Sequence, residues 1–296
     1  MFFTKKIIGL LVIVVFFLAS CSRPVANFTY DKKIEKTAPA KIPFENKSKK
    51  AESYEWDFGD GNTSQEATPS HQYSKSGTYT ITLKAIKKGK VSTKTKSIEI
   101  DAPEKCLVEM ETKFGTIVIL LHNETPKHRD NFIKLVTEGY YEDLLFHRVI
   151  NGFMIQGGDP GSRNAKPNAQ LGSGGPGYQL MPEFVDTLVH IKGALAAART
   201  PNPQKKSSGS QFYIVQGSKY TDAQLDNMER MKGIKYTARQ RKILKEQGGT
   251  PQLDQDYVVY GQVISGMDVI DKIATTPTNG ANRPMEDVKM KLRIIK

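Results

Sequence analysis

Cysteine is scarce in this chain of 296 residues, which contains only Cys21 and Cys106. Two thiols exclude the dense disulfide framework on which many small folds depend, so stability must come from packing. The shares of apolar residues, 38%, and of charged residues, 25%, are ordinary for chains that bury a core. The length leaves room for about two domains of roughly 150 residues each. Cys106 precedes an apolar, strand-like segment and is expected to be a small buried residue.

Long apolar runs are missing as well, except at the N-terminus. There the run Ile7 to Leu18 follows the basic pair Lys5-Lys6. It is shorter than the roughly 20 apolar residues that a membrane-spanning helix requires. Residues 1–20 are therefore predicted to be an export signal that is removed from the mature chain.

The end of this signal resembles a bacterial lipobox, in which a cysteine is diacylated and becomes the first residue of the mature protein. The three residues before Cys21 are Leu, Ala and Ser, and no acidic cluster follows it. The resemblance implies lipidation at Cys21, a tether over residues 21–26, and anchoring to a membrane of the bacterial envelope. The missing acidic cluster favours an anchor that faces the periplasm. An ordinary signal peptide with a chance cysteine is the alternative.

The formal charge of +12 is not concentrated in one region. Removal of Lys5 and Lys6 leaves +10, of which residues 22–101 carry +5, from 15 basic and 10 acidic residues, and the remainder of the chain carries the other +5. A diffuse basic surface of this kind can rest against anionic headgroups. It argues against a nucleic-acid site, where basic residues would cluster.

Residues 27–101 show short strand patterns with turn residues between them. Tyr54 and Trp56 alternate with polar residues, Asp60-Gly61-Asn62 is typical of a turn, and residues 78–85 alternate again. An all-β sandwich is predicted. Residues 102–106, which include Ala-Pro, then read as a linker.

Two motifs in this region, WDFGDG at 56–61 and GTYTITL at 77–83, together resemble a polycystic-kidney-disease (PKD) repeat. The resemblance implies that Trp56 and Tyr79 are core aromatics and that Asp57 and Asp60 accept hydrogen bonds from backbone amides in the turn. Calcium ligation by the two aspartates is the alternative. Two carboxylates across a tight turn are more often turn-formers, and protein contacts are the expected role of this region.

The pattern changes from residue 107 onward. Segments 107–110 and 116–121 are rich in β-branched and apolar residues with Gly115 between them, which predicts a hairpin. Thr125-Pro126 is a typical helix start. Phe132, Leu135 and Val136 then share one face, and Gly139 is expected to end the helix.

The segment FHRVINGFMIQGGD, residues 146–159, resembles the active-site motif of cyclophilins, which are peptidyl-prolyl cis/trans isomerases. GSQFYI at 209–214, Leu253, and YVVYGQV at 257–263 resemble further site segments of that family. The resemblance covers residues 107–296 and implies a closed antiparallel β-barrel capped by helices. The fold class is therefore mainly β throughout: a PKD-like sandwich, then the barrel with a helical insertion.

The resemblance also implies the residues of the site. Arg148, Gln156 and Phe153 would be catalytic. Arg148 would donate a hydrogen bond to the imide nitrogen of the substrate, and Gln156 would orient Arg148 and the substrate carbonyl. Substrate-binding positions would be Met154, Gln211, Tyr213, Leu253, Tyr257, Arg199 and His147, of which His147 is expected to be structural or rim-forming because the reaction gives it no proton to remove. Tyr213 stands where many members have phenylalanine, so its hydroxyl must reach water or a partner. No metal ligands cluster in the sequence, and neither a metal nor a cofactor is expected.

Residues 217–252 are an insertion beyond the minimal cyclophilin fold. Thr221-x-x-Gln224 and Thr237-x-x-Gln240 each predict a capping box, and glycines at 233 and 248–249 would end the two helices. The helical pair either fences one side of the proline site or pads the outside of the barrel.

The predicted function is the rotation of X-Pro bonds in exported, proline-containing polypeptides, in support of folding at the bacterial envelope. The alternative is a membrane-tethered chaperone or adhesin that binds proline-containing segments with little turnover. Proline capture alone would not require Arg148, so that residue discriminates between the two hypotheses.

Overall fold

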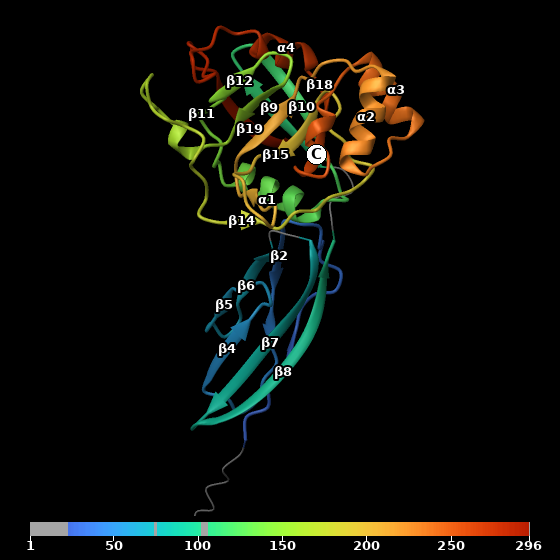
Figure 1. Cartoon of the computed structure of the whole chain (residues 1–296). Coiled ribbons are helices and arrows are strands. Elements are labelled where there is room, and N and C mark those ends of the chain that lie inside the picture. The colour runs from blue at the N-terminus through green and yellow to red at the C-terminus, as the bar shows by residue number, and fades with distance from the viewer. Residues whose placement is uncertain (1–22, 74–75, 102–105, 296) are drawn as a thin grey trace, which may run out of the picture. The chain divides into compact units, whose positions relative to one another are not determined.

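The computed structural model describes residues 23–73, 76–101 and 106–295 (Figure 1). The predicted signal, the predicted lipidation site Cys21 and most of the predicted linker lie outside these ranges. Contacts divide the chain into two compact units. One holds the described parts of Met1–Asp31, Pro43–Pro69 and Thr80–Lys96, and the other those of Lys32–Ile42, Ser70–Tyr79 and Ser97–Lys296.

The strands up to residue 100 form three small sheets, which agrees with the all-β structure predicted for this region. Two are pairs, β1 (Phe28–Thr29) with β3 (Glu45–Asn46) and β2 (Ala40–Pro43) with β6 (Ser70–Tyr73). The third has the order β5 (Thr63–Ser64), β4 (Ser53–Asp57), β7 (Gly77–Lys87) and β8 (Lys90–Ile100).

Trp56 on β4 is the centre of an aromatic core, as predicted. Its side chain is 1% exposed, and its ring lies 5.2 Å from that of Phe28, 5.7 Å from that of Phe44 and 6.3 Å from that of Phe58. Its indole nitrogen donates to the carbonyl of Glu66 at 3.0 Å. The burial of four aromatic rings thus stabilises this small region without a disulfide.

The turn aspartates behave as predicted. Asp57 accepts a hydrogen bond from the Gly59 amide at 2.8 Å, and Asp60 accepts one from the Asn62 amide at 3.1 Å. Gly59 has φ +81°, and a Cβ there would lie 2.7 Å from the backbone oxygen of Thr80, so only glycine fits.

Tyr79 is not the buried aromatic that was expected. It is half-buried, whereas Tyr73 is fully buried with its ring centroid 4.5 Å from that of Tyr79. The paired strand β4 covers β7 only from Thr82 onward. Tyr79 precedes that point, which leaves its side chain partly open.

The isomerase-like region is built on one nine-stranded sheet in which every pair is antiparallel. Its order is β11 (Leu144–Leu145), β19 (Lys289–Ile295), β9 (Cys106–Thr112), β10 (Gly115–Leu121), β18 (Val259–Ser265), β15 (Ala194–Ala197), β17 (Phe212–Val215), β13 (Met154–Gly157) and β12 (Arg148–Ile150). The two end strands, β11 and β12, are consecutive in the chain and only two residues apart. The sheet is therefore strongly curled, and this is the form that the predicted barrel takes.

Every second side chain of these strands points into the curled sheet and fills its inside. Val108 and Met110 on β9 and Ile117 and Ile119 on β10 have no exposed surface. Helices α1 (Pro126–Thr137) and α4 (Met267–Ala274) lie at opposite ends of the sheet (Figure 1) and pack on the same core. Short elements β14 (Gln179–Leu180), β16 (Ser207–Ser208), η1 (Pro160–Ser162) and η2 (Pro251–Leu253) complete the region.

The insertion forms the two helices that its capping boxes predict, α2 (Asp222–Lys232) and α3 (Ala238–Glu246), drawn in orange in Figure 1. Both threonine caps and both returning glutamines make their bonds, and Gly233 closes α2 in the left-handed conformation. Helix α1 likewise begins at Pro126 after Thr125, and Gly139 has φ +67° just beyond its end. Among the described residues, no helix is both long and apolar enough to cross a membrane.

Candidate active site

Three neighbouring strands bring the predicted site residues into line. Arg148 on β12 is the cross-strand partner of Gln156 on β13, and Gln156 is the partner of Tyr213 on β17. Directly paired residues on adjacent strands project their side chains to the same face. Segments that are more than 50 residues apart in the sequence therefore meet on one side of the curled sheet.

These side chains surround a pocket of about 100 Å³. The pocket contains eight of the ten predicted positions, Arg148, Phe153, Met154, Gln156, Arg199, Tyr213, Leu253 and Tyr257, and adds Ala198. Met154 and Tyr213, which are 1% and 4% exposed, give the pocket an apolar base through the thioether chain and the ring carbons. A small apolar ring matches this volume and lining.

A line of polar contacts runs along one side of the pocket. Arg148 Nη1 donates to Gln156 Oε1 at 3.3 Å, and Gln156 Nε2 donates to Gln211 Oε1 at 3.1 Å. Gln211 Nε2 in turn donates to the carbonyl of Gly174 at 2.7 Å. Gln156 therefore holds the guanidinium of Arg148, and Gln211 in turn holds Gln156.

The opposite rim is made by Tyr257 and Arg199. The ring of Tyr257 meets that of Tyr213 edge-on at 5.9 Å, and the guanidinium of Arg199 lies 4.7 Å from the Tyr257 ring centroid. Arg199 Nε donates to the carbonyl of Asp256 at 2.8 Å. Arg199 is therefore held at the rim by Tyr257 and Asp256, whereas Arg148 is held beside the pocket by Gln156.

The nine lining residues include no serine, cysteine, histidine or carboxylate. Burial raises the pKa of Tyr213 well above its ordinary value, so this phenol stays protonated. The pocket offers cationic donors beside an apolar space, which suits a reaction that breaks no covalent bond.

A family model described as cyclophilin type peptidyl-prolyl cis-trans isomerase/CLD matches residues 107–293. The chain belongs to the cyclophilin family. A second model, of the PKD domain, matches residues 21–102. The protein is thus a cyclophilin-type peptidyl-prolyl cis-trans isomerase with an N-terminal PKD domain.

Relatives extend the comparison. A Staphylococcus saprophyticus protein described as a peptidyl-prolyl cis-trans isomerase is 35% identical over 193 residues, which are 64% of this chain and 91% of that protein. A bifunctional phosphatase/peptidyl-prolyl cis-trans isomerase of Streptococcus pyogenes is 37% identical over 187 residues, but the match spans only 37% of its length. A crystal structure of a Cryptosporidium parvum cyclophilin covers 65% of this chain and 98% of its own, with 25% identity and a TM-score of 0.49.

A second, larger cavity of about 420 Å³ adjoins the cyclophilin pocket and shares Gln156, Ala198 and Arg199 with it. The glycine-rich segment 172–177 forms one wall, and Gln211 lines it. Asp159, which is 1% exposed, holds this segment by accepting bonds from the amides of Gly172 and Gly174.

His147 does not join the pocket. It is 4% exposed, lines neither cavity, and neither ring nitrogen has a hydrogen-bond partner. Burial lowers its pKa to about 4, so the ring is neutral at pH 7. His147 lies in the two-residue link between β11 and β12, and its side chain is buried within the molecule, whereas Arg148 lines the pocket. This geometry lends no support to substrate contact by His147.

Two residues behind the pocket escaped the sequence analysis, His190 and Asp254. The hydroxyl of Tyr213 lies 2.9 Å from His190 Nε2, and His190 Nδ1 lies 2.6 Å from Asp254 Oδ1. The expectation that the Tyr213 hydroxyl reaches water or a partner is thus confirmed. The tyrosine itself was the only signal, because 64 residues separate His190 from Asp254. Among the described residues, no three His, Cys, Asp or Glu side chains gather as metal ligands.

Proposed function

We propose that the 100 Å³ pocket is where the isomerase rotates X-Pro bonds. The proline ring would enter the apolar space over Met154 and Tyr213, and Arg148 would face the imide nitrogen. Three observations support this assignment: the size of the pocket, its apolar base, and the Arg148 guanidinium that Gln156 holds at its edge.

The chemistry requires no acid or base. Rotation about a peptide bond crosses a barrier of about 18–20 kcal/mol, because conjugation between nitrogen and carbonyl is lost. In the twisted state the nitrogen gains a lone pair, and a donor aimed at it binds that state better than the planar ground state. Arginine suits this role because its charge is permanent.

Arg148 alone is not sufficient. A hydrogen bond to a charged group is worth about 1.5–3 kcal/mol, whereas a 10⁵-fold acceleration needs roughly 7 kcal/mol. The remainder would come from holding the ring in a dry pocket while the preceding carbonyl swings round. Gln156, which lines the pocket, and Gln211, which lines the adjoining cavity, would bind the peptide backbone during that motion.

The observation that carries this proposal is the guanidinium of Arg148 held by Gln156 beside the apolar pocket. A protease-coupled assay on an X-Pro peptide tests it. The full chain should accelerate isomerisation, and Arg148→Ala should lower kcat/KM by about 10-fold to 100-fold. Equal rates for wild type and variant would remove Arg148 from the reaction.

We further propose that the enzyme acts on exported polypeptides at the bacterial envelope, where it is held by a lipid at Cys21 and faces the periplasm. The basic pair and apolar run before Cys21 support export, and the residues around it support lipidation. The PKD domain would then contact other proteins near the membrane. Cell fractionation of the full chain and of a Cys21→Ser variant tests this location.

A further inference from the structure

The helical insertion joins the isomerase region through a glycine neck directly beside His190. Gly217 has φ +73°, and a Cβ there would lie 2.6 Å from the backbone of Gly249. A Cβ on Gly249 would in turn lie 2.3 Å from the carbonyl oxygen of His190. The Thr250 amide donates to that same carbonyl at 2.8 Å. The backbone of His190 is therefore fixed by the neck of the insertion.

The insertion has its own small core, which faces the region around His190. Leu225 of α2 and Leu244 of α3 have no exposed surface, and they pack with Val189 and Tyr236. Val189 precedes His190 in the chain. The helical pair is thus packed onto the segment that leads to the proline pocket.

A buried line of hydrogen bonds then crosses from the insertion to the pocket. The Tyr236 hydroxyl donates to Asp254 Oδ2 at 2.7 Å, and Asp254 Oδ1 accepts from both Nδ1 and the backbone amide of His190, at 2.6 and 2.8 Å. With its proton on Nδ1, His190 presents the Nε2 lone pair to the Tyr213 hydroxyl at 2.9 Å. His190, Asp254 and Tyr213 are all at most 4% exposed.

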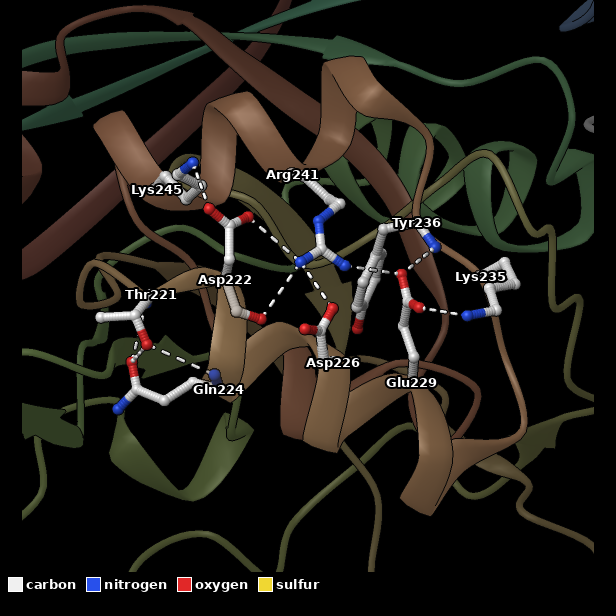
Figure 2. A network of polar contacts seen from close by, with 9 residues as sticks. All are labelled: Thr221, Asp222, Gln224, Asp226, Glu229, Lys235, Tyr236, Arg241 and Lys245. Atoms are coloured by element: carbon white, nitrogen blue, oxygen red, sulfur yellow. Dashed lines mark hydrogen bonds and ion pairs between the residues drawn. The ribbon is translucent and has the colours of Figure 1, made fainter.

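The far end of this line is anchored in the network drawn in Figure 2. Arg241 of α3 reaches Asp222, Asp226 and Glu229 of α2, at 3.1, 2.8 and 3.1 Å. Glu229 also accepts from the backbone amide of Tyr236 at 3.0 Å. The position of Tyr236 is therefore set by the pairing of the two helices.

We propose that Tyr236, Asp254 and His190 are positioning residues that fix two walls of the proline pocket from the insertion. One wall is Tyr213, whose hydroxyl is the end of the line. The other is Leu253, which precedes Asp254 and so moves with its carboxylate. This inference rests on the proposed function of the pocket and assigns the insertion a role in catalysis, in place of padding.

The physical reason is the cost of an unmatched polar group beside an apolar substrate. Without His190, the Tyr213 hydroxyl must turn or recruit water at the base of the pocket. Either change would make the site for the proline ring wetter and less fixed. When His190 accepts the hydrogen bond of the Tyr213 hydroxyl, the Tyr213 ring stays in place and the hydroxyl proton points away from the substrate.

A double-mutant cycle between the insertion and the pocket tests this proposal on the full chain. Tyr213→Phe and Tyr236→Phe each remove one hydroxyl and keep the ring. Each should lower kcat/KM for an X-Pro peptide by roughly fivefold, the factor for one hydrogen bond. The double variant should be no slower than the slower single variant, because both changes break the same line.

Tyr220→Phe is the matched control. It removes a hydroxyl at the start of the insertion that contacts Gln252 at 2.9 Å outside this line, and kcat/KM should not change. Thermal melts would check that each variant is folded. If Tyr236→Phe does not fold, Asp254→Asn breaks the same line of hydrogen bonds and takes its place. An unchanged rate for Tyr236→Phe, or additive losses in the double variant, would overturn the proposal. Arg148→Ala in the same assay separates the two claims: if it is slow while the cycle is additive, the pocket assignment stands and only the role of the insertion fails.

Discussion

Gln156 is the side chain on which the polar half of the pocket depends. Its oxygen accepts from Arg148 and its nitrogen donates to Gln211, so both ends of the amide are in use. An amide can satisfy a donor and an acceptor at once, which neither a carboxylate nor an ammonium can do. This explains why a neutral residue, rather than an acid, holds the arginine: a carboxylate would compete with the substrate for its charge.

Replacement of Gln156 should therefore reduce turnover more than binding. We expect Gln156→Leu to lower kcat by about 10-fold to 100-fold with little change in KM, because Arg148 loses its orientation while the apolar pocket remains. Steady-state kinetics on an X-Pro peptide measure this. Gln262→Leu is the control: it removes another half-buried glutamine, bonded to the Lys192 carbonyl outside the pocket, and should leave both constants unchanged.

His147 makes the free energy of unfolding depend on pH. Its pKa is lowered to about 4 by burial, whereas the unfolded chain takes up the proton near pH 6.5. Between these values the unfolded state binds more protons, so the free energy of unfolding falls as the pH falls. The contribution amounts to about 3 kcal/mol once the pH is below 4.

Urea unfolding at pH 7.5 and pH 4 measures this contribution. The wild type should lose about 3 kcal/mol more than His147→Leu over that interval, because leucine carries no proton. At pH 7.5 the variant should be nearly as stable as the wild type, since neither ring nitrogen makes a hydrogen bond that leucine would lose. An identical pH dependence for both proteins would contradict the assignment.

At the scale of elements, features that act within a few residues could be predicted from the sequence, whereas contacts between distant residues could not. Thr221 and Thr237 each begin a helix because a capping box acts within four residues, and Gly233 ends one for an equally local reason. The contiguous motif around Arg148 predicted four of the nine residues that line the pocket. Nothing local marks His190 and Asp254 as partners, since their meeting depends on how the insertion folds back to the sheet.

The capping boxes can be tested separately from catalysis. Thr221→Ala should destabilise α2 by about 1 kcal/mol and speed amide hydrogen exchange at residues 222–232 by roughly fivefold. Exchange in β9 and β10 should be unaffected, because both are interior strands of the sheet. If exchange rises equally in β9 and β10, the insertion does not open as a separate unit.

At the scale of the whole molecule, the two family matches account for residues 21–102 and 107–293. The curled form of the sheet was predictable only through the family resemblance. Strand patterns alone do not reveal that β11 and β12, two residues apart, lie at opposite ends of the strand order. The placement of Tyr79 was wrong for a similar reason, since alternation does not show where a neighbouring strand ends.

The location of the enzyme is a separate prediction. The full chain, expressed in a bacterium, should appear in the membrane fraction and incorporate labelled palmitate. Cys21→Ser should abolish both, whereas Cys106→Ala should keep the label, because Cys106 is a buried thiol whose pKa burial raises to about 11. Membrane association and label that persist in Cys21→Ser would contradict the proposed anchor.

The most direct test of the pocket assignment is NMR exchange spectroscopy on one X-Pro peptide, which records binding and cis/trans exchange in the same sample. We expect the wild type to produce exchange cross-peaks between the cis and trans signals. Arg148→Ala should still shift the peptide signals but lose most of the exchange, because the apolar pocket remains while the donor is gone. Wild-type protein that binds the peptide without exchange, or equal exchange in both proteins, would contradict the assignment of isomerisation to this pocket.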